Sequence, residues 1–229
     1  FQYRVMDASP DRLAEVFDGT ASVVESAELF EHPLFGRLSK AFLEWNRGAV
    51  RRRTVAPGTL VAEEGEFGTT AFILEEGYLA VCRKAATKGA GLPYADNAEV
   101  VRGLAKVPSK LGAPFWIQAP DPEDVIGEMS PMSHTRRNAS LVAITPARVL
   151  EIDRNVLFVM LRDPSNRDRL DRRYAQRALR EFLPKLARGP GLFGALTPEE
   201  VVEFGKFVAP TVQLVRTTPG YTLCREGEP

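Results

Sequence analysis

The spacing of apolar residues changes near residue 50. From about Ser9 to Trp45 they recur every three or four positions, which is typical of helices. After Arg51, short runs rich in β-branched and aromatic residues lie on either side of a Pro-Gly pair at 57–58 and on either side of Gly77. This change predicts an N-terminal helical segment followed by a β-rich region of short strands and tight turns.

The β-rich pattern continues in three further runs and then gives way to helix. The expected strands lie at residues 115–117, 140–144 and 148–152. Helix is predicted over residues 154–162 and 167–183, with a break between them at 163–166. The second helix has one apolar stripe and a largely basic remainder, which we interpret as a core-facing side and a solvated side.

One segment interrupts the strand pattern. Residues 84–114 are rich in Gly, Ala, Lys and Pro, and the only regular element that they predict is a short helix at 97–104. We interpret this segment as an insertion on a surface loop.

The chain contains an internal repeat. Residues 57–66 align without gaps with residues 219–228, and the Pro, Gly, Glu, Gly and Glu residues are identical in place. Upstream, Leu34–Leu38 (LFGRL) resembles Leu192–Leu196 (LFGAL), and each precedes a predicted helix. Because the order of the features recurs, residues from about 190 onward are predicted to begin a second copy of the first domain.

Composition and charge narrow the class of protein. Lys+Arg and Asp+Glu both number 30, so the chain lacks the basic surplus typical of non-specific nucleic-acid binding. No apolar run approaches the roughly 18 residues of a membrane span, and no signal peptide is visible. The two cysteines, Cys82 and Cys224, are far apart, which favours reduced thiols and a cytoplasmic location. The sequence starts at Phe1 and stops inside the repeat, so we expect it to be a fragment.

The segment Ile126–Ser140, IGEMSPMSHTRRNAS, combines the residue types of an anion site. Pro131 is predicted to be the first residue of a short helix with Ser130 as its N-cap, and the free amides of a helix start favour anions. Arg137 offers a bidentate fork that suits phosphate, and Glu128 can accept hydrogen bonds from a diol. The residue types alone leave a second interpretation open, in which Glu128 and Arg137 form an ion pair that braces a loop.

This segment resembles the phosphate-binding cassette of the cyclic nucleotide-binding domain family. Gly127, Glu128 and Met129 match its opening, Arg137 has the family's spacing from Gly127, and Ala139 and Ser140 match its close. Residues 64–77 resemble an earlier family signature, which consists of a Gly-acid turn, a second Gly, an aromatic strand and a turn Gly. The resemblance covers roughly residues 30 to 185.

The resemblance implies an α+β fold in which helices flank a jelly-roll-like antiparallel β-roll. The expected organisation is a helical segment at 1–50, a β-roll at 51–160 with the inserted loop at 84–114, C-terminal helices at 161–189, and the start of a second domain at 190–229. This tandem arrangement resembles that of kinase regulatory subunits.

The resemblance also implies a ligand and its contacts. The chain would bind cAMP or cGMP, with Arg137 on the cyclic phosphate, Glu128 on the ribose 2′-hydroxyl, and backbone amides of Gly127, Ser130 and Asn138 completing the site. The full candidate set is Gly127, Glu128, Met129, Ser130, Arg137, Asn138, Ala139 and Ser140. Binding would move the C-terminal helices and so control an effector outside this sequence. The implied module performs no catalysis and needs no metal or cofactor, and it has no nucleic-acid or membrane partner. We expect Arg137→Ala to abolish binding without changing the thermal transition of the free protein.

The sequence also departs from the family pattern. Arg136 stands where the family usually has Pro, Ser130-Pro131 replaces Ala-Leu, and Asn138 leaves the choice of base open. Tyr174 and Phe182 are candidates for a lid over the base. The alternative function is a degenerate scaffold that no longer binds nucleotide and acts in protein interaction. A catabolite-activator-type regulator is disfavoured, because the second copy begins where its helix-turn-helix would lie. Neither His32 nor His134 has a ligand cluster in the sequence, and His134 is expected in a solvated loop.

Overall fold

The structure is a computed structural model that describes residues 21–84, 97–186, 196–209, 211–212 and 220–222. The chain divides into two compact units, Phe1–Asp163 and Pro164–Pro229, and each is described by itself. No helix of the described residues is both long enough and apolar enough to cross a membrane.

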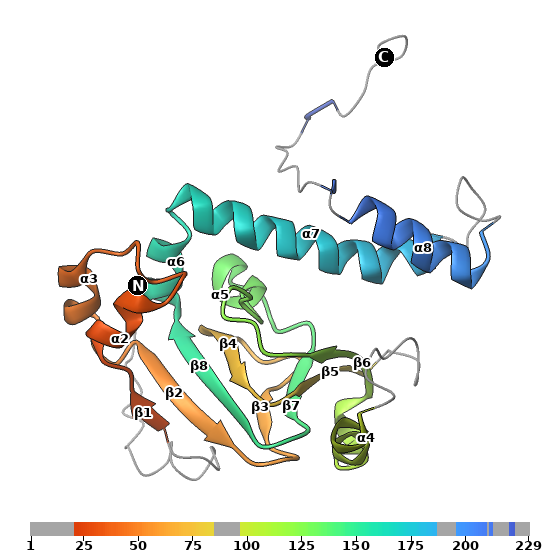
Figure 1. Ribbon diagram of the computed structural model, residues 1–229, viewed down its shortest axis with the longest axis horizontal. Coiled ribbons are helices and arrows are strands. Elements are labelled where there is room, and N and C mark those ends of the chain that lie inside the picture. Colours follow the sequence, from red (N-terminus) through yellow and green to blue (C-terminus); the bar gives the residue numbers. More distant parts are fainter. Residues whose placement is uncertain (1–20, 85–96, 187–195, 210, 213–219, 223–229) are drawn as a thin grey trace. The chain divides into compact units, whose positions relative to one another are not determined.

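The first unit is built from two four-stranded antiparallel sheets (Figure 1). One has the order β1-β2-β8-β4, with bounds Ala21–Val23, Val50–Val55, Ala147–Asp153 and Thr70–Glu76. The other has the order β3-β7-β5-β6, with bounds Leu60–Ala62, Ser140–Ala143, Leu79–Arg83 and Ala113–Gln118. Together with the helices, they form an α+β fold consistent with the expected β-roll, and the turns at Pro57-Gly58 and Gly77 lie between strands as the sequence predicts.

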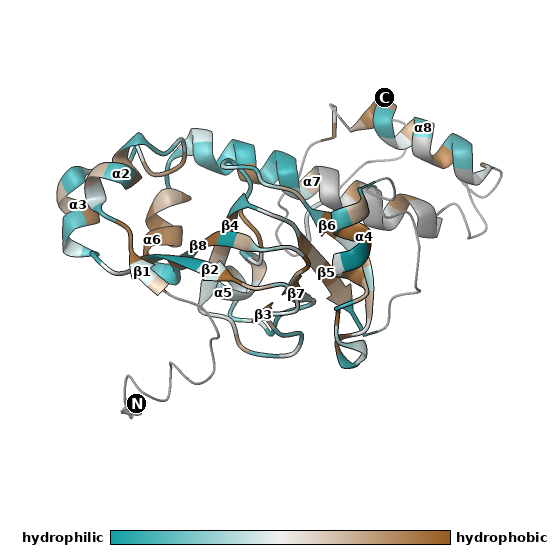
Figure 2. Cartoon of the chain, turned by 60° about the horizontal axis from the view of Figure 1, so that its bottom comes forward, coloured by the Kyte–Doolittle hydropathy of each residue, from teal (hydrophilic) through white to brown (hydrophobic). Residues whose placement is uncertain are grey.

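The two sheets enclose one core, and a helix covers a second. Residues of both sheets, among them Phe72, Leu79 and Val149, form the first cluster. Strand β5 alternates, so that Leu79 joins this cluster while Ala80 and Cys82 join another on the opposite side, with Val100 of α4 (Ala98–Leu104). This two-sided burial explains why β5 is apolar along much of its length (Figure 2).

Helix α4 corrects the interpretation of residues 84–114 as a surface loop. The short helix is present, and the Asn97 side chain caps it by accepting from the amides of Glu99 and Val100. Val100 is fully buried, and a Cβ on Gly103 would lie 1.9 Å from the carbonyl oxygen of Ile144. This helix therefore packs tightly against the end of β7. In the chain, α4 is followed by the 3₁₀ turn η1 (Ser109–Leu111). Residues 85–96 of the insertion lie outside the described residues.

The N-terminal region is less helical than the sequence predicts. Strand β1 is followed by two short helices, α2 (Ser26–Glu31) and α3 (Lys40–Trp45), and residues 1–20 lie outside the described residues. The break falls at His32, which is extended with φ −76° and ψ 137°, because the proline that follows disfavours helical backbone at this position. The turn between the helices buries Leu34 and Phe35 completely.

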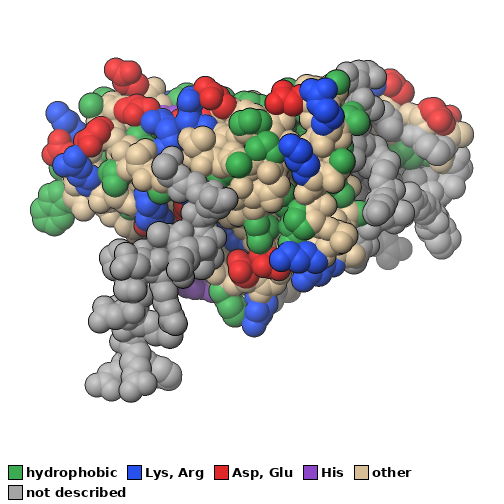
Figure 3. Space-filling model, turned by 90° about the horizontal axis from the view of Figure 1, so that it is seen from below, with side chains coloured by type: hydrophobic (Ala, Val, Ile, Leu, Met, Phe, Trp, Pro, Cys, Tyr) green, Lys and Arg blue, Asp and Glu red, His purple; other side chains and the backbone are tan. Residues whose placement is uncertain are grey.

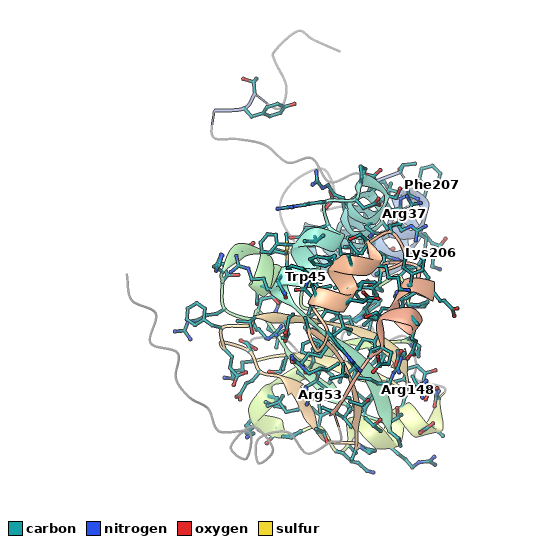
Figure 4. All side chains as sticks on the ribbon, turned by 90° about the vertical axis from the view of Figure 1, so that its left-hand side faces the viewer. Arg37, Trp45, Arg53, Arg148, Lys206 and Phe207 are labelled. Atoms are coloured by element: carbon teal, nitrogen blue, oxygen red, sulfur yellow. The ribbon has the colours of Figure 1, made fainter. Side chains whose placement is uncertain are left out.

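A network of arginines and carboxylates ties α2 to the first sheet. Arg52 of β2 bonds Glu28 at 2.6 Å and Glu75 of β4 at 2.7 Å, and Arg148 of β8 bonds Glu75 at 3.1 Å and Glu76 at 2.6 Å. Arg148 is labelled in Figure 4, which views the first unit from the side of α2 and α3. Burial raises the pKa of Glu75, but Arg52 and Arg148 outweigh this effect and lower it overall.

The described residues of the second unit include the helices α7 (Pro164–Leu186) and α8 (Pro198–Val208). The predicted break between two helices is present, but it falls at residues 161–163, between α6 (Arg154–Met160) and α7. Helix α7 already begins at Pro164, where a first-turn proline loses no intrahelical hydrogen bond. Leu170 of its predicted apolar stripe is buried. Helix α8 begins with a capping box formed by Thr197 and Glu200.

Two local features recur where the internal repeat predicts them. The Ser39 and Thr197 hydroxyls both cap their helices by accepting from the amide three residues on. Gly58 and Gly220 both have positive φ, 91° and 84°. The segment between the two repeated motifs is longer in the second copy by about one helical turn. The helices agree with this difference, because α8 has 11 residues and α3 has 6. The second domain itself remains a prediction, because most residues after 209 lie outside the described residues.

The turn after α2 contains a histidine that must be neutral. Nδ1 of His32 accepts the amide of Leu34 at 3.2 Å, which requires an unprotonated Nδ1. Burial is the main cause that lowers the pKa of His32 below its ordinary value of 6.5; Glu75 raises it and Arg52 lowers it further. Protonation therefore opposes the folded turn.

We expect the free energy of unfolding to fall as the pH is lowered from about 7 to about 5. The folded pKa of His32 is depressed, so its stabilising contribution is complete above the unfolded pKa and is lost as the pH falls through the folded one. His32→Asn keeps an acceptor at this position and should show a flatter dependence in urea unfolding at a series of pH values. Parallel curves for wild type and His32→Asn would contradict the prediction.

Candidate functional site

The segment Ile126–Ser140 leads from β6 to β7 and is anchored on β4. The amide and carbonyl of Ile126 exchange hydrogen bonds with those of Phe72, at 2.7 and 2.9 Å. Gly127 follows with φ 74°, a conformation that favours glycine. The five-residue helix α5 (Met129–Ser133) comes next, and its end contacts α6 (Arg154–Met160). We refer to residues 126–140 as the cassette.

Arg137 points from the cassette into the protein. Only 8% of the residue is exposed, and Nη2 donates to the carbonyl and hydroxyl oxygens of Thr70 at 2.9 and 3.2 Å. Nη1 donates to the Gly127 carbonyl at 3.4 Å, and the guanidinium lies 5.2 Å from the centre of the Phe72 ring. Burial lowers the pKa of Arg137, while the more distant charges of Glu151 and Glu66 act in the opposite direction.

These contacts change the expectation that Arg137→Ala leaves the thermal transition of the free protein unchanged. Arg137 bonds neutral oxygens of β4 and the cassette, so its removal should lower stability as well as ligand binding. The ion-pair interpretation is not needed to explain its position, because Thr70 and Gly127 supply its acceptors.

Two glycines shape the space around the guanidinium. A Cβ on Gly68 would lie 2.5 Å from Cζ of Arg137, and one on Gly127 would lie 2.8 Å from Nη1. Both distances are shorter than van der Waals contact, so the arginine and the missing side chains exclude one another. Gly68 belongs to the upstream 64–77 signature, which the sequence identified without giving this residue a role.

The upstream signature and the cassette form one unit of structure. The Gly65 amide donates to the Arg137 carbonyl, and the Arg137 amide donates to the Glu66 carbonyl, both at 2.8 Å. The hydroxyl of Ser140, which is fully buried, accepts the Glu64 amide at 2.9 Å. Residues some 70 positions apart in the sequence are thereby held in register around Arg137.

The remaining predicted site residues lie in the same segment of the chain. Glu128 is half-buried and immediately follows Gly127, whose carbonyl contacts Arg137. Met129 is 39% exposed and Ser130 is buried. Asn138 is exposed, its carbonyl accepts from Nε of Arg83 at 3.1 Å, and Ala139 is half-buried.

The helix of the cassette starts earlier than predicted. Glu128 is the N-cap, in a helical conformation and without a side-chain cap bond, and Met129 is the first helical residue. Ser130 as N-cap and Pro131 as the first residue are therefore corrected. Pro131 is the third residue of α5 and still lies in the first turn, where the amide that it lacks has no intrahelical partner.

His134 is exposed, as expected, but it has a defined contact. It ends α5 in the left-handed conformation with φ 52°, and both of its ring nitrogens lie against the guanidinium of Arg154, with Nη1 2.8 Å from Nδ1. Arg154 is the first residue of α6 and its amide donates to the Thr69 carbonyl. No local pattern in the sequence indicated this link between the cassette and α6.

The lid candidates belong to the second unit. Tyr174 is half-buried in α7, and the side chain of Phe182 lies outside the described residues. Among the described residues, no group of three or more His, Cys, Asp or Glu residues is placed to hold a metal ion.

No protein-family model and no curated protein match this chain. Similar solved structures include a cAMP-binding acyltransferase from Mycobacterium smegmatis, with 23% identity over 69% of this chain and 41% of that one, and a TM-score of 0.44. Others are cAMP-bound PfPKA-R, with 16% identity over 79% and 51% of the two chains and a TM-score of 0.41, and the Thermus thermophilus catabolite activator protein, with 18% identity over 82% and 91% and a TM-score of 0.39. This chain thus spans less than half of the acyltransferase.

We expect Gly68→Ala to displace the Arg137 guanidinium from Thr70 and to lower the free energy of unfolding by about 1–3 kcal/mol, the cost of a buried donor left without its partner. The backbone at Gly68 is not in the left-handed region, so the added methyl group acts through sterics. Urea unfolding measures the effect, and Thr69→Ala, at the exposed neighbouring position, is the control.

The same substitution in an Arg137→Ala background gives the decisive comparison. The methyl group then has room, so its cost should largely disappear. An equal cost in both backgrounds would show that Gly68 is required for a reason other than Arg137.

Proposed function

We propose that this chain is a regulatory module that binds a cyclic nucleotide, cAMP or cGMP, and performs no chemistry on it. The observation that carries the proposal is the buried guanidinium of Arg137, whose hydrogen-bond acceptors among the described residues are the neutral oxygens of Thr70 and Gly127. An anion would stabilise this buried charge more strongly than these neutral oxygens do.

Electrostatics explains why a phosphate suits this position. Burial disfavours the charged form of Arg137, and neutral acceptors return less than an anion does. A phosphate oxygen pair can accept two parallel hydrogen bonds from one guanidinium, and such charge-assisted bonds are worth roughly 1.5–3 kcal/mol each. The exchange of Thr70 for phosphate therefore provides a driving force for binding.

The rest of the cassette supports a nucleotide and not a bare anion. We assign Glu128 to the ribose 2′-hydroxyl, because its half-buried carboxylate can accept hydrogen bonds and the residue directly follows Gly127, whose carbonyl oxygen accepts from the Arg137 guanidinium. Amides of Gly127, Ser130 and Asn138 complete the proposed contacts. The Asn138 side chain is exposed and can face a base. The comparison of cAMP with cGMP below tests the choice between adenine and guanine.

Ligand binding is proposed to act on the helices that follow the roll. Thr70 gives up Arg137 when phosphate binds, and the adjoining Thr69 carbonyl holds the first residue of α6. The contact of His134 with Arg154 provides a second connection from the cassette to α6. We propose that α6 passes this change to α7 and to an effector outside this sequence, in a tandem arrangement supported by the matching caps of Ser39 and Thr197.

A second candidate is a degenerate scaffold that binds proteins and no nucleotide. One observation favours it: Thr70 and Gly127 already satisfy Arg137, and the Ser140 hydroxyl is already bonded to Glu64. Neither candidate calls for a nucleic-acid partner, and the mixture of acidic and basic side chains on the face shown in Figure 3 agrees with the neutral net charge.

We expect cAMP or cGMP to raise the thermal transition temperature and to bind with micromolar or tighter affinity in calorimetry, while 5′-AMP, which lacks the cyclic phosphate, binds much more weakly. Arg137→Ala should weaken binding at least tenfold, because at least one charge-assisted bond is lost. Arg47→Ala, at an exposed arginine paired with Glu25, is the matched control. No binding of either cyclic nucleotide by the wild type would exclude the sensor and favour the scaffold.

A further inference from the structure

Arg136, the neighbour of the buried arginine, has contacts of its own on the protein surface. Its Nη1 donates to the Gly65 carbonyl at 2.6 Å. Its guanidinium lies 4.4 Å from the centre of the Phe67 ring, within the range of a cation–π contact. Arg136 and Phe67 are also paired as an isolated antiparallel bridge. The arginine therefore grips the loop 64–68 both by hydrogen bonding and by stacking.

The exposure of this pair requires an explanation. Phe67 is 66% exposed and Arg136 is exposed as well, so the stack contributes little to the core. An exposed phenylalanine in a tight loop gains its order from the guanidinium that covers it. The stack of Arg136 on Phe67 can therefore hold the loop 64–68 in position from the protein surface, without contributing to the core of the β-roll.

The loop that Arg136 grips is the one that confines Arg137. Gly65 receives the Nη1 bond of Arg136 on its carbonyl and donates its own amide to the Arg137 carbonyl. One residue after Phe67, Gly68 lies against the Arg137 guanidinium. Adjacent residues of an extended segment point to opposite sides, so Arg136 holds the loop from outside while Arg137 passes beneath it.

We propose that Arg136 and Phe67 form a surface clamp that positions Arg137 for the phosphate. Arg136 is a positioning residue and not itself a phosphate ligand, because its guanidinium is engaged by Gly65 and Phe67. This role rests on the proposed function. It also explains the departure from the family pattern at this position, where the rigid ring of Pro is replaced by a side chain that orders the loop through contacts.

The clamp predicts coupling between Arg136 and Phe67 in ligand binding. Arg136→Ala should weaken the binding of the cyclic nucleotide about tenfold, since it removes a charged hydrogen bond and a cation–π contact that keep the loop in place. Phe67→Ala should have a smaller effect, and the double variant should be no weaker than Arg136→Ala alone. Arg136→Lys should restore part of the affinity, because a lysine can reach the ring and the carbonyl with a single donor group.

Calorimetry of these four variants with the full chain tests the proposal. The matched cycle combines Arg136→Ala with Phe30→Ala, at a 49% exposed phenylalanine of α2, and should be additive. The clamp would be overturned if Arg136→Ala bound the cyclic nucleotide within twofold of the wild-type affinity. It would also be overturned if the effects of Arg136→Ala and Phe67→Ala were independent. Equal affinities of Arg136→Lys and wild type would instead identify a simple charge effect and would also overturn it.

A second measurement separates failure of the clamp from failure of the proposed function. Hydrogen exchange at the Nε–H of Arg137, followed by NMR in the free protein, reports on the confinement of the guanidinium without any ligand. Arg136→Ala should speed this exchange at least tenfold, and Arg47→Ala should leave it unchanged. If wild type binds no cyclic nucleotide, the proposed function fails, and this exchange alone decides whether Arg136 positions Arg137; an unchanged rate would overturn that role.

Discussion

The burial of one guanidinium is the constraint on which the functional half of the β-roll depends. Arg137 is held by Thr70, by the Gly127 carbonyl and by the face of Phe72. Its size requires glycine at positions 68 and 127, and its backbone is paired with the loop that contains Gly65. Strand β4, the upstream loop and the cassette are thus arranged around a largely buried positive charge, and an anion would stabilise this charge.

The two sheets and the helices packed on them form the scaffold that holds Arg137. The two sheets share a core, and α4 closes the outer side of the second sheet, so that β5 is buried on both faces. The first sheet is tied to α2 through Arg52, Glu28 and Glu75. Helix α6 follows β8 directly and contacts the cassette, whereas α4 lies against the other sheet. The cassette is therefore in contact with α6, whose residues Val156, Leu157 and Met160 are buried.

The distribution of arginines shows how the same residue type serves different purposes. Arg52 bridges carboxylates in a half-exposed network, where hydrogen bonds to Glu75 and Glu28 raise its pKa. Arg137 is surrounded by neutral oxygens, and burial lowers its pKa. Arg136 is exposed and stacks on an aromatic ring. Only the second arrangement leaves a buried positive charge that an anionic ligand can stabilise further, which is why the functional proposal rests on Arg137.

The sequence by itself predicted most of the strands and their turns and the two segments that meet at the site, because alternation, Pro-Gly and Gly turns and the cassette motif are local patterns. It also predicted the helix at 97–104, but it placed helix at residues 21–23, where the structure has strand β1. It could not show that Thr70 and Gly68 contact Arg137, that α4 covers a second core, or that His134 meets Arg154, since these contacts join residues distant in sequence. It placed the start of α5 two residues late and extended the N-terminal helix across His32, because a proline's effect depends on which turn of a helix it occupies. Tertiary packing decided the contacts of Arg137, α4 and His134, since only the folded chain determines which oxygen lies within reach of a buried donor.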